Sequence, residues 1–188
     1  MLDGVFSHTG SDSRYFNREG RYGEGGAYRD PNSPYRSWYD FDSRYKGGYR
    51  SWWGFETLPE VNEETPSYVE FITGEGGVID TWLRRGAAGF RLDVADELPD
   101  EFIEKVRTAV KRVGPDKFLL GEVWEDATTK FGFDKRRTYL LGKGLDSVMN
   151  YPFKNAVLGF VCGRDAGQTM TDILSICEHY PAPALDTA

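Results

Sequence analysis

The feature that most constrains the fold is an alternation of short apolar runs with amphipathic stretches after residue 65. Three runs have the length and composition of strands: GFRLDV (89–94), KFLLGEV (117–123) and LDSVMNY (145–151). The stretches between and after them carry apolar residues at helical spacing, as in 102–113. Such an alternation is typical of βαβ units, so the sequence predicts an α/β fold with a parallel sheet.

Local start and stop signals bound the predicted helices. Thr65-Pro66 is a candidate N-cap with proline at the first helical position, and the helix runs to Gly86 with an interruption at GEGG (74–77). A second helix opens at Pro99 and ends at Gly114-Pro115. A last helical stretch is predicted over 154–179, with a break near 163–167.

Charged residues stand at the ends of these strands. Arg91 and Asp93 lie two apart, on one side of GFRLDV, and Glu122 follows FLLG. Asp3 and His8 belong to a further segment, MLDGVFSH. Parallel α/β sheets place their active sites at the carboxyl ends of strands. Spacing alone leaves a second interpretation open, in which Arg91 and Asp93 form a buried salt bridge and Glu122 caps a helix.

Two carboxylates at neighbouring strand ends suit glycoside hydrolysis, in which one is ionised and the other protonated. Arg91 would keep Asp93 ionised. Glu122 would need a raised pKa, for which Val123 and Trp124 are the apolar neighbours.

Residues 9–64 show no sustained helical or strand period. They are rich in glycine, arginine and aromatic residues, and turn signals recur throughout. Disordered chains are usually poor in aromatic residues, so a compact irregular module is predicted, with short strands near 35–41 and 49–55. Its rings form either a small core or, in part, a surface on which sugars stack.

Composition narrows the partners. With 23 basic and 30 acidic residues the net charge is −7, which argues against nucleic acid. There is no apolar run long enough for a membrane span and no signal-peptide pattern, so a cytoplasmic location is expected. Cys162 and Cys177, if on one helix, would lie about 22 Å apart, so two buried free thiols are predicted.

Other chemistries lack their residues. With His8 and His179 as the only histidines and no G-x-S-x-G motif, a serine hydrolase triad has few candidates. His179 is expected at the surface near a helix end. The glycine pairs at 23–26 and 74–77 lack the G-K-[ST] of a phosphate loop, which argues against nucleotide binding.

Ordered motifs then give the chain a resemblance to a known family. These are LDGVFSH (2–8), LPEVN (58–62), GFRLDVADE (89–97) and GEVWEDA (121–127), with LDSVMNYPF (145–153) also similar. In order and spacing they resemble glycoside hydrolase family 13, the α-amylase family, and within it the neopullulanase, cyclomaltodextrinase and maltogenic amylase branch.

The resemblance implies a partial (β/α)₈ barrel. Residues 1–8 would be the end of barrel strand 3, residues 9–64 the inserted domain, and residues 65–188 strands 4 to 6 with their helices. A barrel needs at least about 200 residues and closes by pairing its first and last strands. The resemblance therefore implies a truncated catalytic domain, whose exposed sheet edges would favour self-association.

It also implies roles for single residues. Asp93 would be the nucleophile, Glu122 the acid/base, and Arg91 the partner that positions Asp93. His8 would contact the reacting sugar and Asp3 would support the site. Trp124, Asn62 and Glu97 are the other residues assigned to the substrate side.

Departures from the family pattern matter too. Ser7 stands where calcium-binding members commonly have Asn, so no cofactor is expected to be required. Calcium stays an alternative because residues 9–64 hold several side chains with oxygen donors: Asp12, Asp30, Asn32, Asp40 and Asp42. The His-Asp motif that carries the family's third catalytic carboxylate does not occur, since Asp186 lacks a preceding histidine.

The expected function is that of a retaining hydrolase of maltodextrins, cyclodextrins or pullulan, with the 188 residues alone expected to be inactive. Losing one member of a cooperating catalytic set costs several powers of ten in rate. A non-catalytic carbohydrate-binding module is the alternative from another class. Within the family, the alternative activity is that of a transglycosylase or a sucrose-type isomerase.

Overall fold

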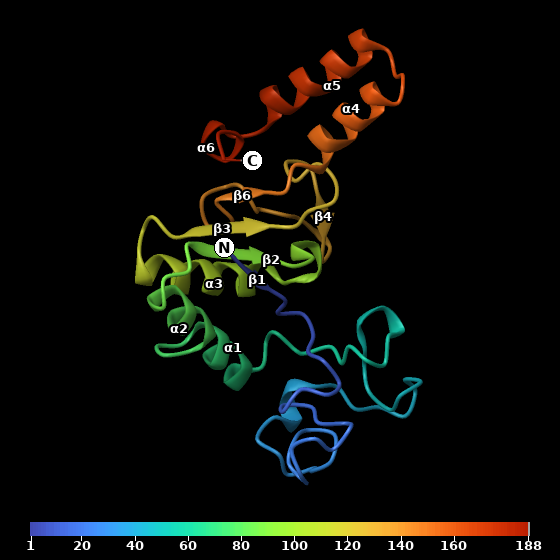
Figure 1. The fold of residues 1–188 in the computed structure, drawn as a ribbon, viewed down its shortest axis with the longest axis vertical. Coiled ribbons are helices and arrows are strands. Elements are labelled where there is room, and N and C mark those ends of the chain that lie inside the picture. The colour runs from blue at the N-terminus through green and yellow to red at the C-terminus, as the bar shows by residue number, and fades with distance from the viewer. Residues whose placement is uncertain (188) are drawn as a thin grey trace.

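A four-stranded parallel sheet forms the centre of the computed structural model, which describes residues 1–187. The strands are β1 (Leu2–Gly4), β2 (Gly89–Leu92), β3 (Phe118–Gly121) and β6 (Ser147–Val148), and they lie in that order across the sheet (Figure 1). Asp3 pairs with Arg91, and Arg91 in turn with Leu120. The prediction of an α/β fold with a parallel sheet is confirmed, and the sheet stays open at β1 and β6.

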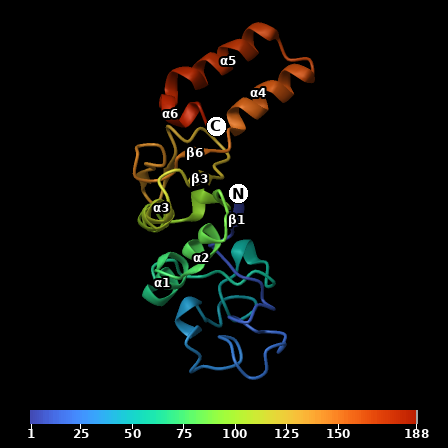
Figure 2. The same ribbon diagram turned by 60° about the vertical axis from the view of Figure 1, so that its left-hand side comes forward.

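Three helices cover one side of this sheet: α1 (Pro66–Thr73), α2 (Val78–Arg84) and α3 (Asp100–Val113) (Figures 1 and 2). The predicted interruption at 74–77 separates α1 from α2. Thr65 stands at the predicted N-cap position, but its hydroxyl donates to the Ser37 carbonyl and caps nothing. The apolar side of α3 is buried through Phe102, Ile103, Val106 and Val110, as its spacing predicts.

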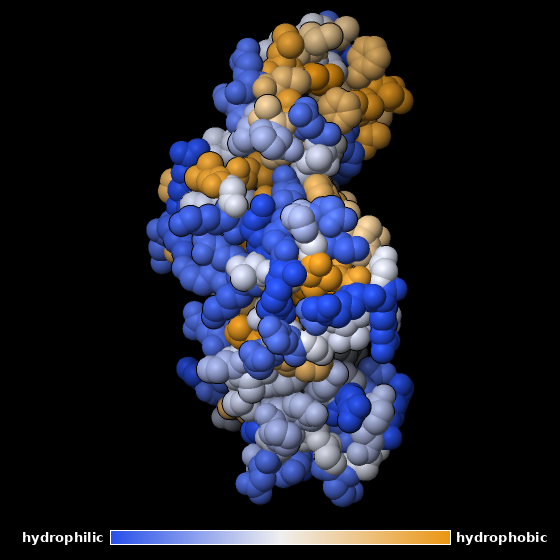
Figure 3. All heavy atoms as spheres, turned by 90° about the vertical axis from the view of Figure 1, so that its left-hand side faces the viewer, coloured by the Kyte–Doolittle hydropathy of each residue, from blue (hydrophilic) through white to orange (hydrophobic). Residues whose placement is uncertain are grey.

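Beyond β6 the chain forms a helical hairpin of α4 (Tyr151–Val161) and α5 (Ala166–His179), followed by α6 (Ala182–Leu185). The predicted break near 163–167 is the turn between α4 and α5. The hairpin projects from the sheet, and Figure 3 shows apolar side chains gathered on it. We call these the apolar face of α4–α5: Phe153, Val157, Leu158, Phe160, Val161, Met170 and Leu174, all exposed.

Residues 9–64, the irregular segment, lie at the opposite end of the molecule (Figure 1). The two strands predicted there are wrong. The structure has 3₁₀ helices at Arg36–Trp38 (η1) and Trp52–Gly54 (η2), and only isolated bridges such as Tyr39 to Val61. Turns at Gly and Pro interrupt any longer pairing.

The irregular segment has its own aromatic core. Phe16, Trp38, Tyr39 and Tyr49 are buried and pack edge to face in several pairs. Between the two interpretations of these rings, a small core accounts for this set. Trp53 and Phe55, by contrast, are exposed.

The prediction for the cysteines is wrong in two respects. Cys162 lies at the end of α4 and Cys177 on α5, so they do not share a helix. Both are free and both are exposed, because they lie on the projecting hairpin and not in a core. His179 ends α5 and is exposed, as predicted. Across the described residues 1–187, no helix combines the length and hydropathy that crossing a membrane requires.

Candidate active site

The guanidinium of Arg91 lies at the centre of the candidate site, where it contacts three carboxylates. Its Nη1 is 2.6 Å from Asp3 Oδ1 and 2.6 Å from Asp93 Oδ1, and its Nη2 is 2.8 Å from Glu122 Oε2. The carboxylates come from the ends of three adjacent strands, β1, β2 and β3. The structure thus brings together the charged residues that the sequence places at strand ends. Three acids against one base leave the cluster negative, so Arg91 screens groups that would otherwise repel one another.

Backbone hydrogen bonds between the strand ends fix this geometry. The Asp93 N–H donates to the Gly4 carbonyl (3.2 Å), and the Glu122 N–H donates to the Leu92 carbonyl (2.9 Å). The parallel ladder therefore continues one residue past the strands, to the catalytic candidates themselves. At Gly121 a Cβ atom would come within 2.2 Å of Leu145 Cδ1, so the glycine just before Glu122 leaves room for the buried Leu145 side chain.

Val94 turns the chain after Asp93 in a backbone conformation that is rare for its residue type. Its φ is 38°, in the left-handed region, where β-branched residues are genuine outliers. In this conformation the Val94 N–H donates to Glu122 Oε2 at 2.9 Å. The turn thus links the segment after β2 to the carboxylate after β3, and strain of this kind gathers at functional sites.

The expectation of a raised pKa for Glu122 is wrong for this arrangement. Burial is the largest influence and would raise the pKa of the Glu122 carboxyl, but several donors together outweigh it and lower that pKa. They are the Val94 N–H, the Trp124 side chain, the charge of Arg91 and the Tyr151 hydroxyl, which donates to Oε1 at 3.1 Å. Donors to the ionised form favour it, so Glu122 is held as a carboxylate here.

His8 lies between the strand ends and the irregular segment. Its Nδ1 is 3.0 Å from Ser7 Oγ, and its ring lies 5.4 Å from that of Trp52, centroid to centroid. Burial lowers the pKa of His8, against the charges of Asp93 and Glu97, which raise it. A neutral imidazole beside Asp93 can donate or accept a hydrogen bond without adding charge.

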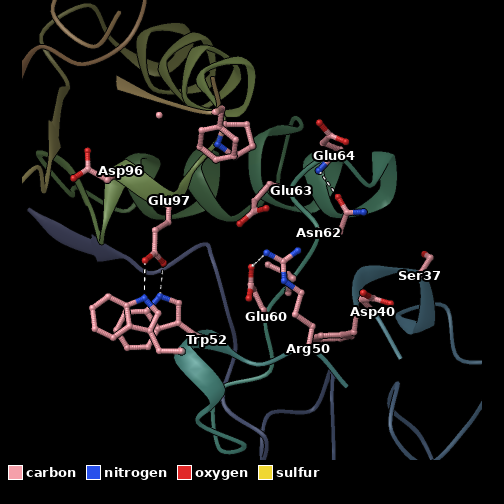
Figure 4. Close-up of a pocket in the computed structure, with 16 residues that line it drawn as sticks. Ser37, Asp40, Arg50, Trp52, Glu60, Asn62, Glu63, Glu64, Asp96 and Glu97 are labelled. Carbon is pink, nitrogen blue, oxygen red and sulfur yellow. Dashed lines mark hydrogen bonds and ion pairs between the residues drawn. The ribbon is translucent and has the colours of Figure 1, made fainter. Parts of the chain in front are cut away.

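Glu97 is held by two tryptophans of the irregular segment. Trp52 Nε1 is 2.5 Å from Glu97 Oε2, and Trp53 Nε1 is 2.7 Å from Oε1, as Figure 4 shows. Trp53 also meets Trp124 edge to face, with centroids 5.9 Å apart. The indoles therefore connect the irregular segment to the turn after β2 and to the segment after β3.

Asn62 lies apart from the three carboxylates. It is exposed, and its Oδ1 accepts from the Glu64 N–H at 2.9 Å. Together with Glu97, it lines a pocket of about 740 Å³ (Figure 4). Trp52, another of the lining residues, lies against the ring of His8. Of the predicted site residues, Asp3, Arg91, Asp93 and Glu122 form one contact group. Glu97 and Asn62 line the pocket, while His8 contacts Trp52 and Trp124 contacts Trp53.

Three residues that contact the site were not predicted from the sequence: Trp52, Trp53 and Tyr151. The adjacent pair Trp52-Trp53 was visible, but nothing in its spacing separates it from the other rings of the segment. Tyr151 stands in LDSVMNYPF, so the motif held a signal that spacing could not interpret. Trp52 contacts Glu97, which is 45 residues away along the chain, and Tyr151 contacts Glu122, which is 29 residues away. Local sequence patterns do not reveal contacts over such separations.

The residues present do not fit a calcium ion. Oxygen donors for calcium must converge on one point. In the irregular segment Asp12 pairs with Arg21 and Asp42 with Arg44, while Asp30 accepts from the Asn32 N–H. Within residues 1–187 no three acidic, histidine or cysteine side chains gather as metal ligands would. Ser7 is buried, and its hydroxyl is hydrogen-bonded to His8.

Comparisons with known proteins give consistent results. The family model described as "Alpha amylase, catalytic domain" matches residues 1–180. An amylopullulanase from Thermoanaerobacterium saccharolyticum is 35% identical over 215 residues, covering 98% of this chain and 16% of that protein. A cyclomaltodextrinase from a Bacillus species is 34% identical over 167 residues, covering 85% of this chain and 26% of that protein.

Among solved structures, the cyclic α-maltosyl-(1→6)-maltose hydrolase from Arthrobacter globiformis superposes with a TM-score of 0.78 at 25% identity. The match covers 97% of this chain and 39% of that one. The chain therefore spans well under half the length of each of these relatives.

Proposed function

This chain belongs to the α-amylase family, its sheet being part of that family's (β/α)₈ barrel, and on that premise we propose that it carries the nucleophile and the acid/base of a retaining α-glucan hydrolase. The observation that carries the proposal is the contact of one guanidinium with Asp93 and Glu122. We propose maltodextrins, cyclodextrins or pullulan as the substrates. The named relatives are an amylopullulanase, a cyclomaltodextrinase and a cyclic maltosyl-maltose hydrolase.

The two carboxylates divide the work between two steps. An Asp93 oxygen attacks the anomeric carbon while the glycosidic C–O bond breaks, and Glu122 gives its proton to the departing oxygen. A water then attacks the same carbon, Glu122 takes a proton from it, and the bond to Asp93 breaks, so both residues are regenerated. Sharing Arg91 keeps the carboxylates close, which favours the retaining separation of about 5–5.5 Å over the wider inverting one.

Glu122 must gain a proton before the first step. Burial already pushes its pKa upward, and a sugar that covers the site would exclude water and strengthen this influence. In the open site, the hydrogen-bond donors to Glu122 act in the opposite direction and lower its pKa. We therefore expect activity to fall on the alkaline side at a lower pH than a carboxyl in a purely apolar pocket would allow.

The surrounding residues position the sugar. His8, neutral and partly buried beside Asp93, is suited to a hydrogen bond with a hydroxyl of the reacting ring. Asp3 binds the same Arg91 nitrogen, Nη1, that contacts Asp93, and so helps to hold the guanidinium in place beside Asp93. Trp124, whose side chain helps to lower the pKa of Glu122 and whose ring contacts Trp53, flanks the leaving group.

The test is to trap the glycosyl-enzyme in the full-length protein that carries this chain. A slow-reacting fluorinated α-glucosyl fluoride needs little acid assistance, so labelling reports mainly on the nucleophile. We expect one glucosyl mass on the peptide that contains Asp93, and none in Asp93→Asn. In Glu122→Gln the label should persist, because its hydrolysis needs the base. A label on another residue, or an unlabelled protein that still hydrolyses maltodextrin, would overturn the assignment.

A further inference from the structure

The pocket lined by Asn62 and Glu97 is built from two separate parts of the chain. One wall comes from the irregular segment, with Trp52, Trp53 and residues 60–64. The other comes from η3 (Ala95–Glu97) and from Gly132 and Phe133. At about 740 Å³ it has the size of a ligand-binding cleft, and Glu97 reaches across it to the two indoles (Figure 4).

Phe133 stands at the tip of a small hairpin between β3 and β6. Its strands are β4 (Phe131–Gly132) and β5 (Lys135–Arg136), and the turn residues Phe133 and Asp134 have φ values of 53° and 58°. Such a two-residue turn normally carries Asn-Gly, because both positions are left-handed. A phenylalanine there is costly and, at 54% exposed, buries little surface in return.

Arg137 anchors the hairpin to η3. Its side chain is 1% exposed; it donates to the Asp96 carbonyl (2.8 Å), the Leu98 carbonyl (2.6 Å) and Asp100 Oδ1 (2.7 Å). The same guanidinium lies 5.1 Å from the centre of the Phe133 ring. The tip is therefore fixed beside the turn that carries Glu97, and the ring is held ready before any ligand arrives.

Trp53 presents the corresponding surface on the other wall. It is 64% exposed, yet its indole is fixed by Glu97 and lies 5.1 Å from that of Trp52, nearly parallel to it. Its φ of 50° is again left-handed. Trp53 and Phe133 thus line the same cleft, and both are exposed and have unfavourable backbone conformations. Trp53 is fixed by its hydrogen bond to Glu97, and Phe133 by its contact with the Arg137 guanidinium.

The charges of the cleft favour a neutral ligand. Its lining holds six acids, Asp40, Glu60, Glu63, Glu64, Asp96 and Glu97, against Arg50 as the one base. Several are already engaged: Glu60 with Arg50 (2.7 Å), Asp96 with Lys130 (3.2 Å) and Glu97 with the indoles. Burial raises the pKa of Glu63 to about 8, so near neutral pH it offers a proton to a hydroxyl oxygen. Anions are repelled, while a polyol finds acceptors, donors and ring faces.

We propose that Phe133 and Trp53 are the aromatic walls of an outlying sugar subsite, which holds a glucosyl unit of a neutral α-glucan chain extending from the catalytic carboxylates. The proposal rests on the proposed function for its substrate class. Phe133 is then a specificity-determining residue: it adds affinity only for chains long enough to reach the hairpin. Trp124, which touches both Trp53 and Glu122, lies on the way between the two sites.

The test compares two phenylalanines of the same hairpin. In the full-length protein silenced by Glu122→Gln, we expect Phe133→Ala to weaken binding of maltohexaose about fivefold, with maltose unchanged. Phe131→Ala is the matched control, because Phe131 is 71% exposed on the same hairpin but does not line the cleft. Dissociation constants from calorimetry give the comparison, and Phe133→Tyr should restore maltohexaose affinity by keeping the ring.

Three outcomes would overturn the proposal: equal effects of the two alanine variants, an equal loss for maltose and maltohexaose, or no loss at all. Thermal unfolding of each variant shows whether the hairpin is disturbed, and Phe133→Leu supplies a milder replacement without a flat ring. The trapping experiment on Phe133→Ala in the Glu122 wild-type background separates this proposal from the first. A label on Asp93 with unchanged maltohexaose affinity would remove the subsite and keep the proposed reaction.

Discussion

At the scale of the residue, Arg91 explains why a buried strand carries charge. A lone arginine or aspartate on β2 would cost several kcal/mol of desolvation, but here the guanidinium has two full partners at 2.6 Å and a third at 2.8 Å. All three carboxylates stay at the sheet's end, where water and substrate can reach them. The salt bridge between Arg91 and Asp93 is thus observed, but it is half-buried and not buried, and Asp3 and Glu122 extend it into a site.

The hydrogen bond from Tyr151 to Glu122 predicts how activity depends on pH. The Tyr151 hydroxyl donates to Glu122 and lowers that carboxyl's pKa. Tyr151→Phe removes the donor, so the pKa of Glu122 should rise and the alkaline limb of kcat/KM on a maltodextrin should move to higher pH. Tyr22→Phe, an exposed tyrosine far along the irregular segment, is the control. A limb that stays in place or moves down would show that Glu122 is not the titrating acid.

At the scale of the element, the β4–β5 hairpin depends on one buried arginine. Arg137 satisfies the carbonyls of the turn after β2 and pairs with Asp100 at the start of α3. Arg137→Met would remove the donor to these carbonyls and leave Asp100 only its longer contact with Lys135 (3.6 Å), so we expect local opening of residues 95–100 to become easier by about 3 kcal/mol. Hydrogen exchange should then accelerate about 100-fold there. Arg136→Met, one residue away and exposed, should change exchange at residues 95–100 little; equal effects would refute the anchoring role.

At the scale of the whole molecule, the sheet is open and the apolar face of α4–α5 has no cover within residues 1–187. Val161 is 75% exposed and Leu174 53%. A patch of this kind on a chain studied alone should associate. We therefore expect the 188-residue chain to form larger species as its concentration rises, measured by sedimentation velocity. Val161→Lys with Leu174→Lys should reduce this, whereas Gln168→Lys on α5 should not. A monomer at all concentrations would contradict the expectation.

The parts of the fold that follow from local chemistry were predictable from sequence. Apolar runs of strand length, a proline at Pro66 and glycines at 74–77 and 163–167 each act on the backbone directly, so β2, β3, α1 to α3 and the α4–α5 turn appear where predicted. The charged strand ends were predicted to meet because parallel strands end together, and Arg91 contacts Asp3, Asp93 and Glu122.

What the sequence could not decide depends on distant segments. Nothing local distinguishes Trp53 or Phe133 from a core ring, and nothing local reveals that Val94, Trp124 and Tyr151 together lower the pKa of Glu122. The same holds for the cysteines, whose exposure follows from how far the α4–α5 hairpin projects. Backbone propensities and strand order are set by neighbours along the chain, whereas desolvation, hydrogen-bond donors and the two walls of a cleft are set by groups that only tertiary packing brings together.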